Sequence, residues 1–430
     1  MNHDDDANLV IDIEAMLGEA ETSVTDDCCI YRVPFGIRRC NQDAYTPKVV
    51  SIGPFHHDSH SRLQSMEQHK LSYCKAFLQR SETASETWTR YIKGVEPNIR
   101  RCYSDTLEFT QAKLVKILFV DSGFILELFL RYHSRQWSKD DACLSKPWLD
   151  TIIRLDLLLL ENQLPFSLLQ SLYNMSVSSR SKDSFPSFVE LTFDYFDYYN
   201  GSNLECDNIS ISHFTDLIRT FHLQHPPQKR PPRTDDDLVM HLPSATELSE
   251  AGVRIRVNSN SECLLDLNFS RGVLKIPKLT VEDGTELIFR NMVALEQCHY
   301  PDESYIIDYV DFLDFLVNTS RDVDLLVQKG VLVNWLGDTD SLANMFNGLM
   351  KSITQTNGSS HYFQLSQRLN AFCKDPLHKL NSTLRRDYCN SPWKTVVSIA
   401  GIFLLILSLV QSVCSVLQVI QQHNASPKTW

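Results

Sequence analysis

The sequence contains none of the short motifs that mark common nucleotide-binding and hydrolytic sites. It has no GxxxxGKS or GxxxxGKT loop and no GxGxxG loop to hold phosphates, no GxSxG elbow for a nucleophilic serine, and no paired HRD and DFG motifs. Cysteine–histidine catalysis uses residues that meet only in space, so the sequence leaves it open. We therefore expect no enzyme, and the alternative is a hydrolase with a metal or cysteine site.

Positive charge is also in short supply. The chain has 41 Lys and Arg against 53 Asp and Glu, a formal net charge of −12. A nucleic-acid binder needs a basic face that displaces counterions, so a nucleic-acid partner is not expected. Acidic residues gather at the N-terminus, beginning with Asp4, Asp5 and Asp6, and few large apolar residues interrupt them. This composition predicts a disordered acidic tail over residues 1–27.

The cysteines and histidines lack the spacing of metal sites. The twelve cysteines include no CxxC pair, which favours reduced structural thiols over a disulfide framework or a zinc site. The best metal candidates are His56, His57 and His60, because a helix would place His56 and His60 on one face. Pro54 and Asp58 favour a turn instead. We expect packed or hydrogen-bonded histidines, and no cofactor.

One long segment without charge is present near the C-terminus. Thr395 to Leu417 comprises 23 uncharged residues. A helix of that length spans about 34 Å, enough to cross a hydrocarbon core of about 30 Å. Trp393 and Lys394 precede it and suit the headgroup region. A buried core helix of this length usually carries charge on one face. The segment therefore predicts a transmembrane helix over 395–417, with the lipid bilayer as partner and a short tail at 421–430.

Two patterns disagree about the side of the membrane on which the domain lies. No signal peptide is expected, and Arg385, Arg386 and Lys394 precede the apolar segment, which favours a cytosolic domain. Against this, the chain has eight N-x-S/T sequons where roughly three are expected by chance. These sequons lie at Asn174, Asn200, Asn208, Asn268, Asn318, Asn357, Asn381 and Asn424. We expect a membrane protein, at the plasma membrane, with the cytosolic orientation favoured over the extracellular one.

Residues 28–390 show mixed helical and extended patterns. The first part, 28–57, is broken by Pro34, Pro47 and Pro54 and predicts irregular structure with a short strand at 49–52. Residues 174–240, which include the HPPQKRPPR stretch at 225–233, predict a loose loop or linker with one helical stretch at 209–223. Apolar periodicity predicts further helices at 62–79, 106–132, 148–160 and 165–173, and others after 244.

The second half begins with regular structure. Capping patterns predict helix starts at Ser244, Asp283 and Thr319. Alternating segments at 253–257, 263–269 and 273–279 predict a small antiparallel sheet. The fold class is therefore mainly α, a large helical globular domain with a small antiparallel β-sheet, plus one C-terminal transmembrane helix.

Several polar residues are embedded in apolar sequence. Glu161 and Asn162 follow four consecutive leucines, and Arg290, Asn291 and Glu296 lie in an apolar helix. Buried polar groups must be hydrogen-bonded, so we predict a structural network that fixes how the two halves pack. The alternative is a polar binding pocket. If the network includes a buried ion pair, Glu161→Ala and Arg290→Ala should each lower stability by about a few kcal/mol.

Several of these segments together resemble a plant-specific family called domain of unknown function 247. The resemblance covers residues 28–417. It is carried by CCIYRVPFGIRRCNQDAYTPKVVSIGPFHH at 28–57, MEQHK at 66–70, LLLLENQLPF at 157–166, SATELSEAGV at 244–253, LTVEDGTELIFRNMVALEQC at 279–298 and SRDVDLLVQKGVLVNWLG at 320–337. The resemblance implies a plant membrane protein with one C-terminal span and no established catalytic residues. Some grass members map to self-incompatibility loci.

We therefore expect a single-pass, membrane-anchored plant interaction or recognition protein, in self-recognition or signalling. Its protein partner is unknown. Exposed stretches at 80–100 and 174–240 are the predicted partner contacts, so exchanging 174–240 between variants should transfer partner choice.

Overall fold

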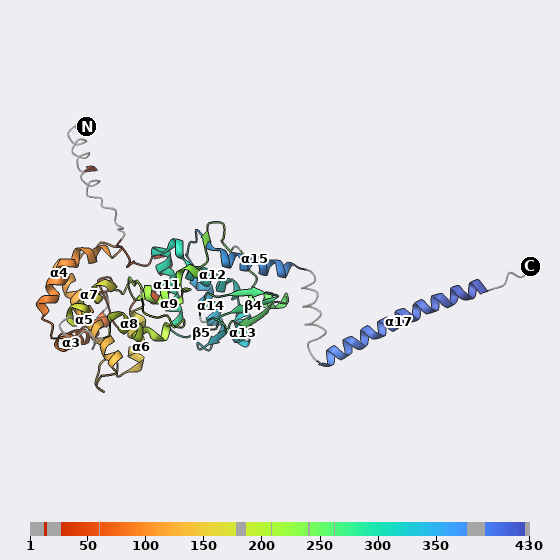
Figure 1. Ribbon diagram of the computed structural model, residues 1–430, viewed down its shortest axis with the longest axis horizontal. Helices are drawn as coiled ribbons and strands as arrows, with labels where there is room; N and C mark the ends of the chain where they lie inside the picture. Colours follow the sequence, from red (N-terminus) through yellow and green to blue (C-terminus); the bar gives the residue numbers. More distant parts are fainter. Residues whose placement is uncertain are drawn as a thin grey trace, which may run out of the picture.

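The computed structural model shows an elongated body of packed helices with small sheets, and one long helix that stands apart from it (Figure 1). This confirms the predicted, mainly helical fold class. The structure describes residues 13–14, 27–59, 61–177, 186–207, 209–239, 241–261, 263–375 and 392–425. Apart from 13–14 and Asp27, the predicted acidic tail lies outside them.

The N-terminal half is built around one buried helix, α5 (Gln111–Ser134). Helices α3 (Gln64–Ser81) and α4 (Ser85–Arg101) pack against it. The contact between α3 and α5 is close at Gly123, where a Cβ atom would lie only 2.4 Å from Cys74 Sγ. Part of the predicted contact stretch 80–100 is therefore committed to the core, since α4 buries Trp88 and Ile92 there.

The stretch predicted as a loose loop, 174–240, contains ordered helices. Helix α7 (Phe166–Val177) runs into it, and α8 (Phe188–Phe196) and α9 (Phe214–His222) lie within it. The aromatic residues of α8 are buried, and Tyr195 stacks on Phe129 of α5 at a ring distance of 4.5 Å. Helix α9 lies in the helical stretch predicted at 209–223, so that part of the prediction is confirmed. The predicted loose loop was wrong at α8, because its aromatic side chains fill the core. Helix α6 (Pro147–Asp156) completes this half.

The N-terminal segment 28–57 has little regular structure. It contains α2 (Phe35–Arg38) and a 3-10 turn, η1 (Gln42–Tyr45). Residues 49–52, predicted as a strand, pair with no strand. Instead, the N–H groups of Lys48, Val49 and Val50 donate to the Asp156 carboxylate at 2.7–2.9 Å. A side chain thus replaces the neighbouring strand, which is why the prediction fails.

The sheets are small and lie in the C-terminal half. Strands β2 (Arg254–Val257), β4 (Val273–Ile276) and β3 (Asn268–Ser270) form one sheet in that order. Strands β2 and β4 match two of the predicted strands, whereas β3 overlaps the predicted strand 263–269 only at residues 268–269. Strand β2 pairs parallel with β4, so the sheet is mixed and not antiparallel. The two other sheets are a parallel pair, β5 (Leu279–Val281) with β6 (Leu332–Asn334), and an antiparallel pair, β1 (Arg233–Thr234) with β7 (Gly358–Ser359).

Helices surround these sheets. They are α10 (Ala245–Glu250), α11 (Thr285–His299), α12 (Tyr305–Leu316), α13 (Ser320–Gln328), α14 (Thr339–Leu349) and α15 (Ser360–Lys374). The predicted capping boxes that start with Ser244 and Thr319 are confirmed. The predicted cap at Asp283 is wrong, because α11 begins after Gly284 and Thr285 Oγ1 accepts the Glu282 N–H.

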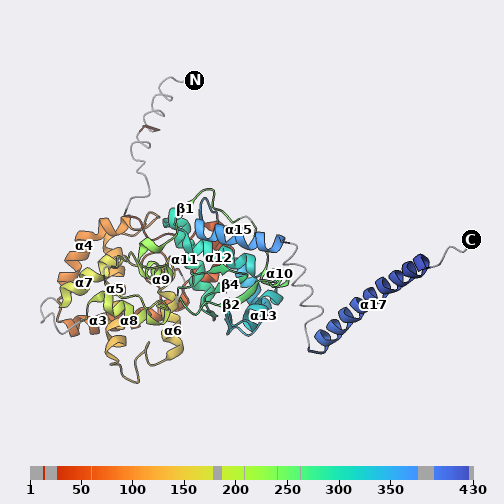
Figure 2. The same ribbon diagram turned by 45° about the vertical axis from the view of Figure 1, so that its right-hand side comes forward.

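Helix α17 (Pro392–Ala425) stands apart from the body in both views (Figures 1 and 2). Its segment 399–421 is long and apolar enough to span a membrane, and none of it is buried against the rest of the chain. The predicted span 395–417 lies within this helix, which continues through the first half of the predicted tail to residue 425. The apolar helix is therefore separate from the body, which keeps its own core.

Candidate functional site

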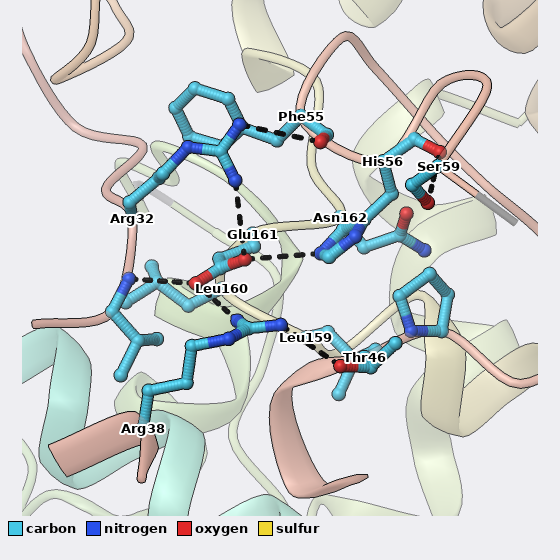
Figure 3. Close-up of polar contacts among 12 residues, drawn as sticks. Arg32, Arg38, Thr46, Phe55, His56, Ser59, Leu159, Leu160, Glu161 and Asn162 are labelled. Atoms are coloured by element: carbon cyan, nitrogen blue, oxygen red, sulfur yellow. Dashed lines mark hydrogen bonds and ion pairs between the residues drawn. The ribbon is translucent and has the colours of Figure 1, made fainter. Parts of the chain in front are cut away.

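The turn after α6 forms a buried polar cluster, which we call the Glu161 cluster: Glu161 with Arg32, Val33, Arg38 and His56. Helix α6 ends at Asp156, and Leu157–Leu160 turn inward. Glu161 Oε1 accepts from Arg38 Nη1 at 2.6 Å and from the Val33 N–H at 2.9 Å. Glu161 Oε2 lies 3.1 Å from His56 Nε2 and 3.8 Å from Arg32 Nη1 (Figure 3). One carboxylate therefore anchors the N-terminal segment.

The charge of Glu161 is balanced inside the protein. Burial alone would raise its pKa. The contact with His56, the Arg38 charge and the Val33 N–H outweigh burial and hold the pKa below its usual value. Glu161 is therefore an ionised anchor at neutral pH. A general acid would need the opposite shift, toward a raised pKa.

The side-chain amides of Asn162 and Gln163 form hydrogen bonds within the fold. Asn162 Oδ1 accepts the Ile52 N–H at 2.8 Å, and its Nδ2 donates to the carbonyls of Val50 and Asp156. Gln163 Oε1 accepts the Phe214 N–H at 3.0 Å, which ties α9 to the same turn. This part of the predicted network joins the N-terminal segment and α9 to the turn after α6.

The predicted network residues of α11 divide into three contacts. Asn291 joins the turn, since its Oδ1 accepts the Leu160 N–H at 2.9 Å and its Nδ2 donates to the Ala44 carbonyl. Arg290 pairs with Glu286 on its own helix, at 2.7 Å, and so does not face Glu161. Glu296 lies elsewhere, bonded to Arg219 at 2.8 Å and to the N–H groups that begin α12.

A buried ion pair and a separate buried carboxylate were missing from the sequence-based set. Lys70 Nζ donates to Asp121 Oδ1 at 2.6 Å and to the Ser51 carbonyl at 2.8 Å, while Asp121 Oδ2 accepts the Gly53 N–H. Asp156 is the separate carboxylate, and burial raises its pKa to about 6 despite three N–H donors. Asp121 and Asp156 stand in apolar helical sequence, which is the signal that could have found them, whereas Lys70 lies among polar residues of α3.

Two of the three candidate metal ligands, His56 and His57, contact different carboxylates. His56 belongs to the Glu161 cluster, and His57 Nε2 lies 3.6 Å from Asp58 Oδ1. His60 lies outside the described residues. Within the described ranges, no three histidine, cysteine or acidic side chains are placed to hold a metal ion. The polar residues of this region are therefore better suited to holding the fold together.

A surface cavity of about 690 Å³ lies between α9, α11 and the small sheets, and we call it the aromatic cavity. Its walls include Tyr198, Tyr199, Phe221, Ile288, Phe289 and Trp335. Tyr198 is 62% exposed and Trp335 is 67% exposed, although both are large aromatic residues. The backbone N–H of Trp335 donates to the Val281 carbonyl at 2.9 Å, and the Tyr198 hydroxyl donates to Glu282 Oε2 at 2.9 Å. The Tyr198 side chain and the Trp335 backbone are thus held in place at the rim.

The cavity also borders the edge of a strand. Leu279 and Val281 of β5 direct their backbone groups to β6, since the Leu279 N–H donates to the Val331 carbonyl and the Val281 carbonyl accepts the Trp335 N–H. Thr280 lies between them, so its N–H and C=O point to the opposite side, and it lines the cavity. The aromatic cavity therefore combines apolar walls with backbone polar groups.

The comparisons with known proteins concern the whole chain. A family model described as plant protein of unknown function, domain of unknown function 247, matches residues 30–407. The chain belongs to this family. UPF0481 protein At3g47200 of Arabidopsis thaliana is 29% identical over 438 aligned positions, which cover 95% of this chain and 91% of that protein.

A second relative is more distant. Putative UPF0481 protein At3g02645, also of Arabidopsis thaliana, is 22% identical over 510 aligned positions that cover 95% of this chain and 94% of that protein. No solved structure matches the chain significantly. The family match begins at Ile30, beside the Glu161 cluster, and ends within α17. The family region therefore includes both the body and the first part of the apolar helix.

Proposed function

We propose that this plant protein is a membrane-tethered binding protein, in which α17 crosses the bilayer and the aromatic cavity receives a partner. The observation that carries the proposal is the apolar segment 399–421, whose described side chains are all exposed to solvent. An uncovered apolar surface of this length is costly in water. At about 1.5 Å per residue it reaches about 35 Å, which matches a bilayer core of about 30 Å.

Charge substitution in α17 tests the anchor. Val410 lies near the centre of 399–421, so Val410→Arg should cost about 3 kcal/mol of insertion free energy. We expect a larger fraction of the protein to be extracted from plant membranes by sodium carbonate. Val327→Arg is the matched control, because Val327 is a partly exposed valine on the body. Equal extraction of both variants and the unaltered protein would refute the anchor.

The aromatic cavity supports a binding role through its rim. Exposed Trp and Tyr residues beside a cavity are typical of binding hot spots, because they supply large rigid contact areas. Thr280 adds a backbone donor and acceptor, which suits an extended peptide segment of a protein partner. Tyr198, Tyr199 and Phe221 belong to 174–240, the stretch predicted to select partners. We therefore propose recognition of a protein in self-recognition or signalling.

Site-specific photo-crosslinking tests the cavity. A photoreactive phenylalanine analogue replaces either Trp335 or Trp148 in the full chain expressed in plant cells. Trp148 is the matched control, because it is 61% exposed on α6, away from the cavity. We expect a discrete crosslinked species at 335 that Tyr198→Ala abolishes. Equal crosslinking at both positions, or no effect of Tyr198→Ala, would contradict the proposal.

A cytosolic orientation of the body at the plasma membrane is part of the same proposal, and two of the sequons that count against it are engaged within the fold. Asn357 is buried and its Oδ1 accepts from Arg233 Nε at 2.9 Å, so the folded protein hides it. Asn200 bonds the backbone of Leu204 through both ends of its amide. Asn268 and Asn318 are exposed. A glycosidase-sensitive shift of the full chain that Asn268→Gln and Asn318→Gln remove would reverse this orientation.

A further inference from the structure

Two cysteines lie side by side where the N-terminal segment meets the end of α4. Ile30 and Tyr103 form a parallel β-bridge. The N–H groups of Cys29 and Ile30 both donate to the Cys102 carbonyl, at 3.0 and 2.9 Å, and the Ser104 N–H donates to the Ile30 carbonyl. This register places Cys29 opposite Cys102. Neighbouring strands lie about 4.8 Å apart, within the range of about 4.4–6.8 Å that a disulfide requires between Cα atoms.

The two thiols also affect each other's ionisation, and Cys102 Sγ donates to the Asn98 carbonyl at 3.5 Å. The hydrogen bond to Cys102 and burial raise the pKa of Cys29. The hydrogen bond from Cys29 lowers the pKa of Cys102 against the effect of burial. Cys102 is also partly exposed, so it is the thiol that ionises first and can be reached from solvent.

We propose that Cys29 and Cys102 form a reversible disulfide by exchange with a small disulfide such as oxidised glutathione. The Cys102 thiolate attacks one sulfur of the oxidant, and one glutathione leaves as a thiolate. The Cys29 thiolate then attacks the Cys102 sulfur of the mixed disulfide and releases the second glutathione. The protein gives up two protons and two electrons, and the oxidant becomes two thiols.

The neighbouring cysteines lack this arrangement. Cys28 is buried, and burial raises the pKa of its thiol. Cys298 is near Cys28 and has a pKa raised by burial to about 12. Cys74 and Cys143 are buried within the N-terminal half. Of the cysteines that the structure describes, Cys102 alone combines a lowered pKa with a thiol partner.

The disulfide would fasten the entry of the N-terminal segment. Arg32 and Val33, which contact Glu161, follow Cys29 closely in the chain. A covalent bond from Cys29 to Cys102 would hold them next to the Glu161 cluster. Such a bond closes a loop of more than seventy residues, and loops of that size give large stabilisation in the chain-entropy account. Oxidation would therefore stabilise the body without changing its packing.

The test equilibrates the full chain, in detergent, with defined ratios of reduced and oxidised glutathione. Free thiols are then alkylated and tryptic peptides are identified by mass spectrometry. We expect two fewer alkylated thiols on oxidation and a disulfide between the peptide ending at Arg32 and the peptide beginning at Cys102. The melting temperature should rise on the order of 5 °C.

Single substitutions assign the bond. The N-terminal tryptic peptide contains both Cys28 and Cys29, so each is replaced by serine in turn. Cys29→Ser and Cys102→Ser should each abolish the disulfide, while Cys28→Ser and the buried control Cys143→Ser should keep it. A disulfide that needs Cys28, a stable glutathione adduct on Cys102, or two unchanged thiols at oxidising ratios would each overturn the proposal. None of these readouts involves the membrane or the partner.

Discussion

Replacing Glu161 by alanine should destabilise the body strongly. The side chain is almost fully buried, and its removal leaves the Val33 N–H and the side chains of Arg38 and His56 without their acceptor. His56 is itself buried, so water does not replace the lost carboxylate freely. Breaking a buried charge pair from one side costs about 3–5 kcal/mol. We expect a loss in that range in the free energy of unfolding.

The matched control uses another carboxylate that touches the same cluster. Asp105 pairs with Arg32 at 2.8 Å, but both side chains are nearly half exposed. An exposed pair of this kind contributes about 0–1 kcal/mol. Asp105→Ala should therefore change stability little, although it removes a charge from the same arginine. Comparing the two variants therefore distinguishes the effect of removing a buried carboxylate from that of removing an exposed one.

Urea denaturation of the full chain in detergent, followed by tryptophan fluorescence, measures both variants. The pH dependence adds a second readout. Because the pKa of Glu161 is lowered in the folded state, its contribution is present above the unfolded value of about 4.3 and is lost as pH falls through the folded value. Glu161→Gln should flatten this acid limb. A loss below about 1 kcal/mol for Glu161→Ala, or an unchanged acid limb for Glu161→Gln, would refute the role assigned to Glu161.

Two further predictions concern packing and pH. Gly123→Ala should destabilise the body by about 1–3 kcal/mol, because the new methyl group meets Cys74 at under 3 Å. Gly94→Ala on α4 adds a methyl group with no atom within 4 Å and should stabilise the body by about 0.5–1 kcal/mol. Thermal melting of both variants checks this. Burial, with Asp314 and Asp308 nearby, raises the pKa of Asp311 to about 7, so stability should fall as pH rises from about 4 to 7. Asp311→Asn should reduce that fall by on the order of 2 kcal/mol in denaturation curves at pH 5 and 8.

Local signals in the sequence were sufficient for many elements. Ser244 and Glu247 lie three positions apart and form the capping box that they predict. The uncharged run before residue 417 lies in one helix. The α8 helix was missed although Ser187 and Glu190 form another capping box and Phe188, Leu191 and Tyr195 follow helical spacing. The surrounding serine, tyrosine and aspartate residues concealed that periodicity.

Other features depend on contacts between distant parts of the chain. Asp156 satisfies the backbone of residues 48–50, more than a hundred positions earlier, and no local pattern encodes that pairing. Likewise, alternation shows that 254–257 and 273–276 are strands but does not give their relative direction. The sequence identified the network residues as buried but did not identify the residues that they bond. Arg290 pairs with Glu286, and Glu161 pairs with Arg38. The sequence pattern around a polar residue therefore predicts its burial better than it predicts which residue it bonds.

The dependence of residues 28–57 on later parts of the chain has a consequence for synthesis. These residues leave the ribosome early, but the Asp156 and Glu161 carboxylates that bind them are made over a hundred positions later. The Asn291 amide that holds Ala44 follows later still. Contacts of such long sequence separation form slowly. The N-terminal segment therefore cannot complete its docking before residue 291 has been synthesised, which makes this docking a late step of the body's folding.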